Sequence, residues 1–134
     1  MPNQVPNQDS QHSRVQKNTK QTGDAAEERA LRHLQDQGLR LLQRNYRTPG
    51  RGGGEIDWVM QDPAGVVVFV EVRQRTHAGW GGALASVTPG KQRRIIWAAR
   101  HYLQRWPGPP PYCRFDVVAL EPSGPRWIEG AFTL

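Results

Sequence analysis

The segment that most constrains the fold is a run of apolar residues at positions 66–72, VVVFVEV, which ends in charge. Consecutive apolar residues predict a central strand that is covered on both sides. Glu71 and Arg73 stand two residues apart, so their side chains share a face, about 7 Å apart at Cα. A carboxylate on so apolar a strand is costly unless it is compensated. We expect the compensation to come from Arg73, a backbone donor or a divalent metal ion.

A second acid lies on the preceding segment. Residues 55–61, EIDWVMQ, predict a strand on which Glu55, Asp57 and Val59 share a face. The short turn that follows permits an antiparallel hairpin, which brings Asp57 towards Glu71. Oxygen ligands in this number suit Mg²⁺ or Mn²⁺ rather than zinc. The alternative is a cross-strand ion pair that closes the end of the sheet.

A third acid lies on a predicted helix. Residues 23–37 carry an apolar stripe of Ala30, Leu31 and Leu34, and a glycine follows them as a stop signal. Glu27 lies three, four and seven residues before the stripe, so helical spacing puts it on the buried side. It is therefore a candidate third acid of the site. The alternative is an acid near a helix N-terminus, which the helix dipole favours.

Cations gather where a second helix is expected to begin. Thr88 suits the N-cap and Pro89 the first helical position. Lys91, Arg93 and Arg94 lie in or near the first turn, where the dipole disfavours cations. A bound phosphate would explain this placement, because free N–H groups there already favour anions. The alternative is ordinary solvated charge.

The remaining segments complete an α/β domain in the order α-β-β-β-α-β-β. Further strands are expected at residues 39–47, 114–120 and 126–129. The helix between the third and fourth strands permits a right-handed parallel crossover. Two glycine-rich loops are expected, one at residues 48–54 with Arg51 and one at residues 76–86 with Trp80. Glycines allow close backbone approach to a partner, and Trp80 is the best candidate for base stacking.

Length and composition limit the class of protein. The 134 residues suffice for one domain, and 18 Lys and Arg against 12 Asp and Glu give a net charge of +6. This surplus of positive charge favours the binding of polyanions, although it also serves solubility. Residues 1–21 are polar and predict a disordered basic tail before a domain at residues 22–134. We find no apolar run of membrane-spanning length, no signal peptide and one cysteine, so we expect a cytoplasmic protein without membrane contact.

Several motifs in order resemble those of the YraN family, bacterial proteins predicted to be endonucleases. They cover residues 22–132 and include GDAAEERALRHL, LQRNYR, GGGEIDWVM, VVFVEVRQR and RFDVVAL. The family is similar to archaeal Holliday-junction resolvases. The resemblance therefore implies a restriction-endonuclease-like PD-(D/E)xK core, with a mixed central sheet flanked by helices. It also implies a Mg²⁺- or Mn²⁺-dependent endonuclease on structured or branched DNA, and it suggests a homodimer.

The resemblance assigns roles to individual residues. Asp57 matches the metal-binding Asp, Glu71 the acid of the (D/E)xK element, and Glu27 the first-helix Glu of the resolvase-like branch. Arg73 stands where the family of folds has Lys. An arginine stays charged and cannot act as a general base, although it can bind a phosphate oxygen. Two alternatives therefore stay open: a non-catalytic nucleic-acid-binding module, and a structural or protein-interaction domain.

The leading hypothesis also places the nucleic acid. Lys91, Arg93 and Arg94 would grip the backbone beside the scissile phosphate, and Arg51 lies in the loop that approaches it.

Overall fold

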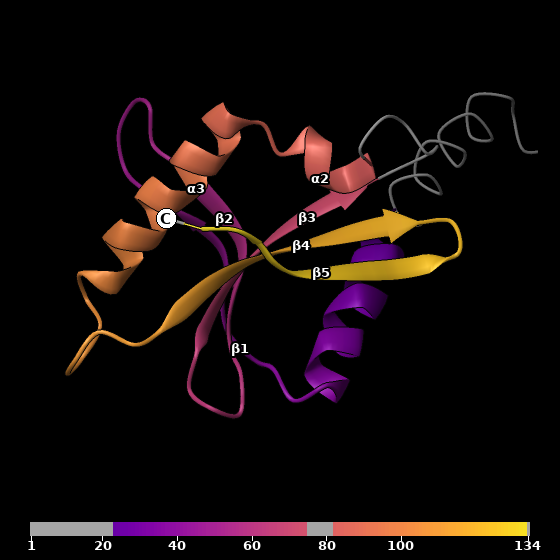
Figure 1. The fold of residues 1–134 in the computed structure, drawn as a ribbon, viewed down its shortest axis with the longest axis horizontal. Helices are drawn as coiled ribbons and strands as arrows, with labels where there is room; N and C mark the ends of the chain where they lie inside the picture. Colours follow the sequence, from indigo (N-terminus) through magenta and orange to yellow (C-terminus); the bar gives the residue numbers. More distant parts are fainter. Residues whose placement is uncertain (1–22, 75–81, 134) are drawn as a thin grey trace, which may run out of the picture.

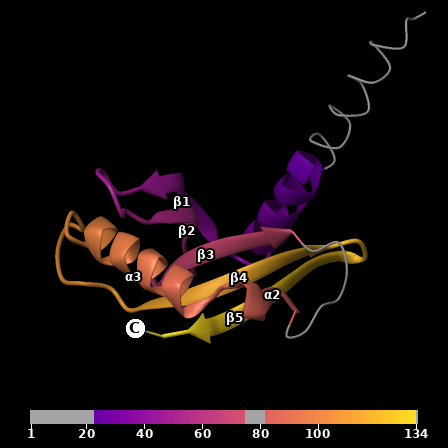
Figure 2. The ribbon, with the colours of Figure 1, turned by 90° about the horizontal axis from the view of Figure 1, so that it is seen from above.

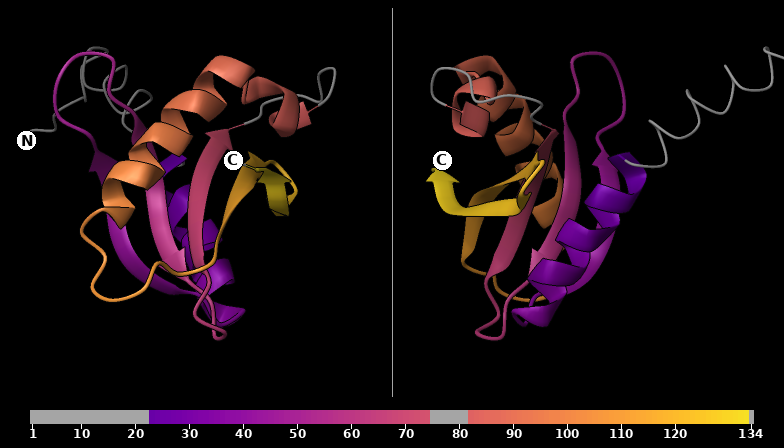
Figure 3. Two further views of the ribbon diagram at one scale, coloured as in Figure 1. Left: turned by 60° about the vertical axis from the view of Figure 1, so that its left-hand side comes forward. Right: turned by 90° about the vertical axis from the view of Figure 1, so that its right-hand side faces the viewer.

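The protein is described by a computed structural model that covers residues 23–74 and 82–133. In this part of the chain a five-stranded sheet lies between helices (Figures 1 and 3). A helix at residues 23–36, called helix 23–36 below, covers one face, and α3 (Pro89–Leu103) covers the other. None of the described helices is long and apolar enough to cross a membrane. The predicted tail and Trp80 fall outside the described residues.

The sheet is mixed, as the sequence predicts. Its strands lie in chain order: β1 (Arg40–Arg47), β2 (Glu55–Gln61), β3 (Val67–Gln74), β4 (Cys113–Glu121) and β5 (Gly124–Phe132). The first three strands pair antiparallel, β4 runs parallel to β3, and β5 returns antiparallel (Figure 2). The predicted hairpin of β2 and β3 and the predicted parallel crossover to β4 are both confirmed.

Two features differ from the predicted order. A short helix, α2 (Gly82–Ser86), precedes α3 in a region that the sequence predicts as loop. Five residues with only Ala83 buried are too few to produce a helical pattern of apolar residues. The last strand is also longer than the predicted range 126–129, because Gly124 and Gly130 resemble turn signals although they lie within it.

Helix 23–36 forms where its apolar stripe predicts it. Ala30 and Leu34 are fully buried, and Gly38, with a φ of 101°, follows the helix in a conformation that glycine adopts readily. At the start of α3, Thr88 is the N-cap, and its side chain accepts a hydrogen bond from the N–H of Lys91. The first helix therefore ends, and α3 begins, for the reasons that the sequence indicates.

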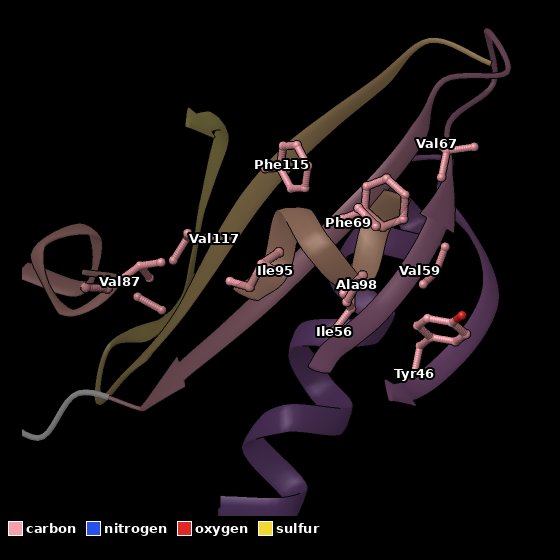
Figure 4. Close-up of a cluster of buried hydrophobic side chains, with 13 residues drawn as sticks. Tyr46, Ile56, Val59, Val67, Phe69, Val87, Ile95, Ala98, Phe115 and Val117 are labelled. Carbon is pink, nitrogen blue, oxygen red and sulfur yellow. The ribbon is translucent and has the colours of Figure 1, made fainter. Parts of the chain in front are cut away.

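Each face of the sheet has its own hydrophobic core. On the α3 side, Val59 and Phe69 of the sheet pack with Ala98 of the helix (Figure 4). On the opposite side, Trp58 and Leu34 belong to a second cluster of buried residues. Because β2 and β3 contribute to both clusters, their positions are fixed from two directions.

The carboxylate of Asp116 on β4 is fully buried and fully hydrogen-bonded. It accepts hydrogen bonds from Arg114 Nε (3.1 Å), Trp127 Nε1 (2.9 Å) and the backbone N–H of Gly130 (2.9 Å). The pairing of β4 and β5 shifts register beside Asp116, as at a β-bulge. We therefore regard this acid as a structural group that joins β4 to β5.

The loop before β2 packs tightly against α3. A Cβ atom at Gly54 would lie 2.0 Å from the carbonyl oxygen of Arg94, so only glycine fits. The N–H of Gly54 also donates a hydrogen bond of 2.7 Å to Thr48 Oγ1, which closes the loop at its base. The loop that contains Arg51 is thus held beside the first half of α3.

We predict that Gly54→Ala destabilises the protein, because the new methyl group must displace the backbone of α3 or of the loop. The expected loss is about 1–3 kcal/mol in the free energy of unfolding, measured by urea denaturation. Gly90→Ala is the matched control, since its Cβ would meet atoms only at 3.8 Å and beyond. Equal stability of the two variants would contradict the close approach of loop and helix.

Candidate functional site

The strands β2 and β3 separate at the position of the predicted acids. Their pairing ends at Trp58↔Val70, and the next residues beyond that pair are Asp57 and Glu71. Asp57 Oδ2 accepts a hydrogen bond of 2.8 Å from the backbone N–H of Val72. A side chain of β2 thus takes the place of a backbone acceptor at the point where the two strands part.

The alternation of side chains along β2 is interrupted at this point. Ile56 packs in the core beneath α3, whereas Trp58 packs in the core beneath helix 23–36. Asp57 lines a cavity of about 430 Å³ together with Glu27 of that helix. The prediction that Asp57 simply shares the face of Val59 is therefore wrong, because regular alternation does not continue through Asp57.

A second cavity, of about 310 Å³, lies on the α3 side of the sheet. Acidic and basic side chains line it together: Glu55, Glu71, Arg73, Lys91 and Arg94. Gly53 and Gly54 of the loop before β2 also line it, beside the start of α3. We call it the Glu71 cavity. It combines carboxylates, cations and closely approaching backbone in one opening.

Glu71 and Arg73 contact each other without a well-aligned hydrogen bond. Glu71 Oε1 lies 3.5 Å from Arg73 Nε, and the side chains are only 15% and 21% exposed. The Nε atom of Arg73 is buried and has no hydrogen-bond partner within the described residues. The contact therefore offsets the charge of Glu71 but does not hold the two side chains in a fixed arrangement.

Both strand acids hold their protons more tightly than ordinary carboxyl groups do. Burial, and then repulsion by Asp57, raise the pKa of Glu71 from 4.5 to about 7, although Arg73 and Lys91 oppose the rise. Burial also raises the pKa of Asp57, against the effect of the hydrogen bond from Val72. Near neutral pH the site therefore lacks enough positive charge to keep both acids fully ionised.

Glu27 lies near Asp57 but not in the Glu71 cavity. Glu27 Oε1 is 4.0 Å from Nη2 of Arg44 on β1, and its charge contributes to the raised pKa of Asp57. Among the described residues, no three His, Cys, Asp or Glu side chains form a group that could hold a metal ion. The structure thus brings Asp57 together with Glu27 on one side and near Glu71 on the other, without one shared pocket.

The predicted cations occupy three different places. Lys91 and Arg94 line the Glu71 cavity. Arg93 is exposed on α3 outside that lining, and Arg51 is exposed in the loop beside the helix. Glu55 is a lining residue that the sequence analysis did not select, although its place two residues before Asp57 could have indicated it.

The comparison with known proteins identifies the family. Residues 26–120 match the family described as "Uncharacterised protein family UPF0102". The chain belongs to this family. UPF0102 is the YraN family, so the resemblance seen in the motifs is confirmed at the level of the family.

Close relatives carry the same family label. A UPF0102 protein of Albidiferax ferrireducens is 68% identical over 114 residues, which cover 85% of this chain and 88% of the relative. A UPF0102 protein of Paracidovorax citrulli is 60% identical over 114 residues, covering 85% and 84% of the two chains. One of Cupriavidus taiwanensis is 59% identical over 110 residues, covering 82% and 81%. The likeness extends over most of both chains in each case.

We predict that Glu71→Gln stabilises the protein at alkaline pH and has little effect near pH 4. In the folded chain Glu71 stays protonated up to about pH 7, whereas in the unfolded chain it ionises near pH 4.5. Stability is therefore lost as the pH rises through this window, by up to about 3 kcal/mol. Glutamine mimics the protonated acid and avoids this loss.

Urea denaturation of both proteins at several pH values between 4 and 8 measures the effect. Asp36→Asn, an exposed acid on helix 23–36, is the control. A difference between wild type and Glu71→Gln that does not grow with pH would contradict the burial of Glu71.

Proposed function

We propose that this UPF0102 chain has a PD-(D/E)xK nuclease fold and binds nucleic acid, DNA above all, at the Glu71 cavity. We further propose that it hydrolyses a phosphodiester bond there with Mg²⁺ or Mn²⁺. One observation carries the proposal: two carboxylates with raised pKa values, Asp57 and Glu71, lie where β2 and β3 part, and cations of α3 line the cavity of Glu71.

The cations of the cavity suit a phosphate group. Lys91 and Arg94 lie in the first turns of α3, where they are unfavourable for the helix dipole. The first turn contains no acidic residue to offset them. An anion would be stabilised both by these side chains and by the dipole. Arg73 can add a bidentate contact to a phosphate oxygen.

The two strand acids suit a divalent cation. Because each has a raised pKa, an added positive charge near them would favour their ionised forms. Mg²⁺ commonly uses one or two carboxylates and fills its shell with water and phosphate oxygens. Asp57 and Glu71 would be these ligands. Glu27 lines the same cavity as Asp57. When bound, the ion would lower the pKa of a water molecule and stabilise charge on the phosphate.

The other residues have separate tasks. The N–H of Val72 holds the carboxylate of Asp57 in place at the split. Arg73 offsets the charge of Glu71 and, in contact with substrate, that of the phosphate. A guanidinium does not serve as a general base, so we assign no proton transfer to Arg73. Lys91 and Arg94 hold the neighbouring backbone.

The preference for structured or branched DNA rests on the resemblance to junction resolvases, and so does a homodimer. A junction-cutting enzyme must act on two strands, which two copies of one site would allow.

We predict that the purified protein cleaves a four-way DNA junction in the presence of Mg²⁺ or Mn²⁺, and that Asp57→Ala abolishes cleavage. Removal of the metal by a chelator is expected to have the same effect. The rate of product formation on a labelled junction measures it, with Asp36→Ala as the matched control. Equal activity of wild type and Asp57→Ala would mean a contaminant or a different site.

Metal binding can also be measured without an assay of activity. At pH 8, Mg²⁺ or Mn²⁺ should raise the midpoint of thermal unfolding of the wild type, because binding to the folded state stabilises it. Glu71→Gln should lose this rise.

A second candidate function is a non-catalytic nucleic-acid-binding module. The observation that favours it is the contact of Arg73 with Glu71, since a permanent cation already compensates this acid without a metal. On this reading the cations still bind phosphate, and no proton transfer takes place. A purely structural role for the same ion pair would leave the protein without affinity for nucleic acid.

Arg73→Lys distinguishes the two candidates. For a non-catalytic module we predict salt-sensitive DNA binding that does not depend on Mg²⁺, without cleavage by the wild type. Gain of cleavage in Arg73→Lys would indicate that the arginine alone prevents the reaction. Fluorescence anisotropy at several salt concentrations measures binding, and Lys91→Ala should reduce the salt dependence by about one phosphate contact. Absence of binding at low salt would contradict both candidates.

A further inference from the structure

An exposed tryptophan lies between arginines on the outward face of α3. Arg93, Trp97 and Arg100 are spaced by four and three residues, so they form one line along the helix. Trp97 is 59% exposed, and both arginines are exposed. The sheet covers one side of α3 (Figure 3), and Ile95, Ala98 and Ala99 are buried there. Helical spacing puts the line of Arg93, Trp97 and Arg100 on the opposite side. We call it the Trp97 stripe.

Charge on this helix has one sign only. The sequence of α3, PGKQRRIIWAARHYL, contains no Asp or Glu. Within the described residues, none of its lysine or arginine side chains forms an ion pair. Because no acid on α3 offsets these cations, the face that carries them complements a polyanion.

The stripe lies next to the Glu71 cavity. Arg94 lines that cavity and stands three residues before Trp97, so the two side chains are neighbours on the surface of the helix. From Lys91 to Arg100 the helix rises about 13–14 Å, at 1.5 Å per residue. This length is enough for a few nucleotides of one strand. One strand could thus contact the cavity and the stripe together.

A tryptophan is an unusual residue for a face that only contacts phosphates. Its ring offers a flat surface on which any base can stack, but a base inside a duplex already stacks on its neighbours. The arginines one turn before and one turn after Trp97 suit the phosphates on either side of such a base.

We propose that the Trp97 stripe binds an unpaired segment of nucleic acid, with Trp97 stacked on a base and Arg93 and Arg100 on the flanking phosphates. The inference rests on the proposed function and narrows it: the preferred substrate has unpaired nucleotides next to the bound phosphate. It also assigns a role in recognising nucleic acid to a face of α3 that carries none of the acids of the site.

The test compares a single-stranded oligothymidylate with an oligonucleotide of the same length that has abasic positions at its centre. Both carry the same phosphates, so their difference reports base contacts alone. In fluorescence anisotropy, Trp97→Ala should weaken binding of the oligothymidylate about tenfold, within the range known for one stacked base. Its binding of the abasic strand should change by less than about twofold. Trp97→Phe keeps a ring and should recover most of the loss.

Tyr112→Ala is the matched control, because Tyr112 is an exposed aromatic residue before β4 and outside the stripe. It should bind both strands like the wild type. If the wild type binds DNA but Trp97→Ala weakens binding of both strands equally, or of neither strand, the stacking role is overturned while the proposed function stands. If the wild type binds neither a junction nor these strands at low salt, the proposed function fails first.

Discussion

The hydrogen bond between the carboxylate of Asp57 and the N–H of Val72 determines how the site is built. Two antiparallel strands that continued to pair would place Asp57 and Glu71 on a regular ladder, with the backbone groups of both strands satisfied. Here the ladder ends at Trp58↔Val70, and a side chain supplies the next acceptor. Backbone polar groups that lose a ladder partner need such a replacement when they are buried. The split between the strands and the position of the acid thus have the same cause.

Two acids with low exposure, Asp116 and Glu71, have different surroundings. Asp116 on β4 has donors from two side chains and one backbone group, so its charge is stabilised by well-formed hydrogen bonds. Glu71 has a guanidinium at 3.5 Å without a well-aligned hydrogen bond, and burial and the neighbouring Asp57 raise its pKa. The difference is typical of functional sites, where perturbed pKa values gather.

The sequence predicted the elements well and the site only in part. The apolar stripe of Leu34, the N-cap Thr88 and the run before Glu71 identified their helices and strand because local periodicity and capping decide them. Glu27 is separated from the Glu71 cavity because helix 23–36 and α3 cover opposite faces of the sheet, and helix periodicity alone does not say which face each helix covers. The position of Asp57 on the side of Glu27 follows from the interrupted alternation of β2, which strand periodicity does not encode. Five residues of α2 were too short to show a pattern.

The way β2 and β3 part has a consequence for the dynamics of the sheet. Towards the turn their backbones are paired with each other and lie between two packed cores. Beyond Trp58↔Val70, β2 stays paired with β1 and β3 with β4, and the hydrogen bond from Val72 to Asp57 joins the two strands. A change in the gap between β2 and β3 at Asp57 would therefore break this contact but no ladder pair between them, which allows the site to adjust to a bound molecule while the sheet stays folded.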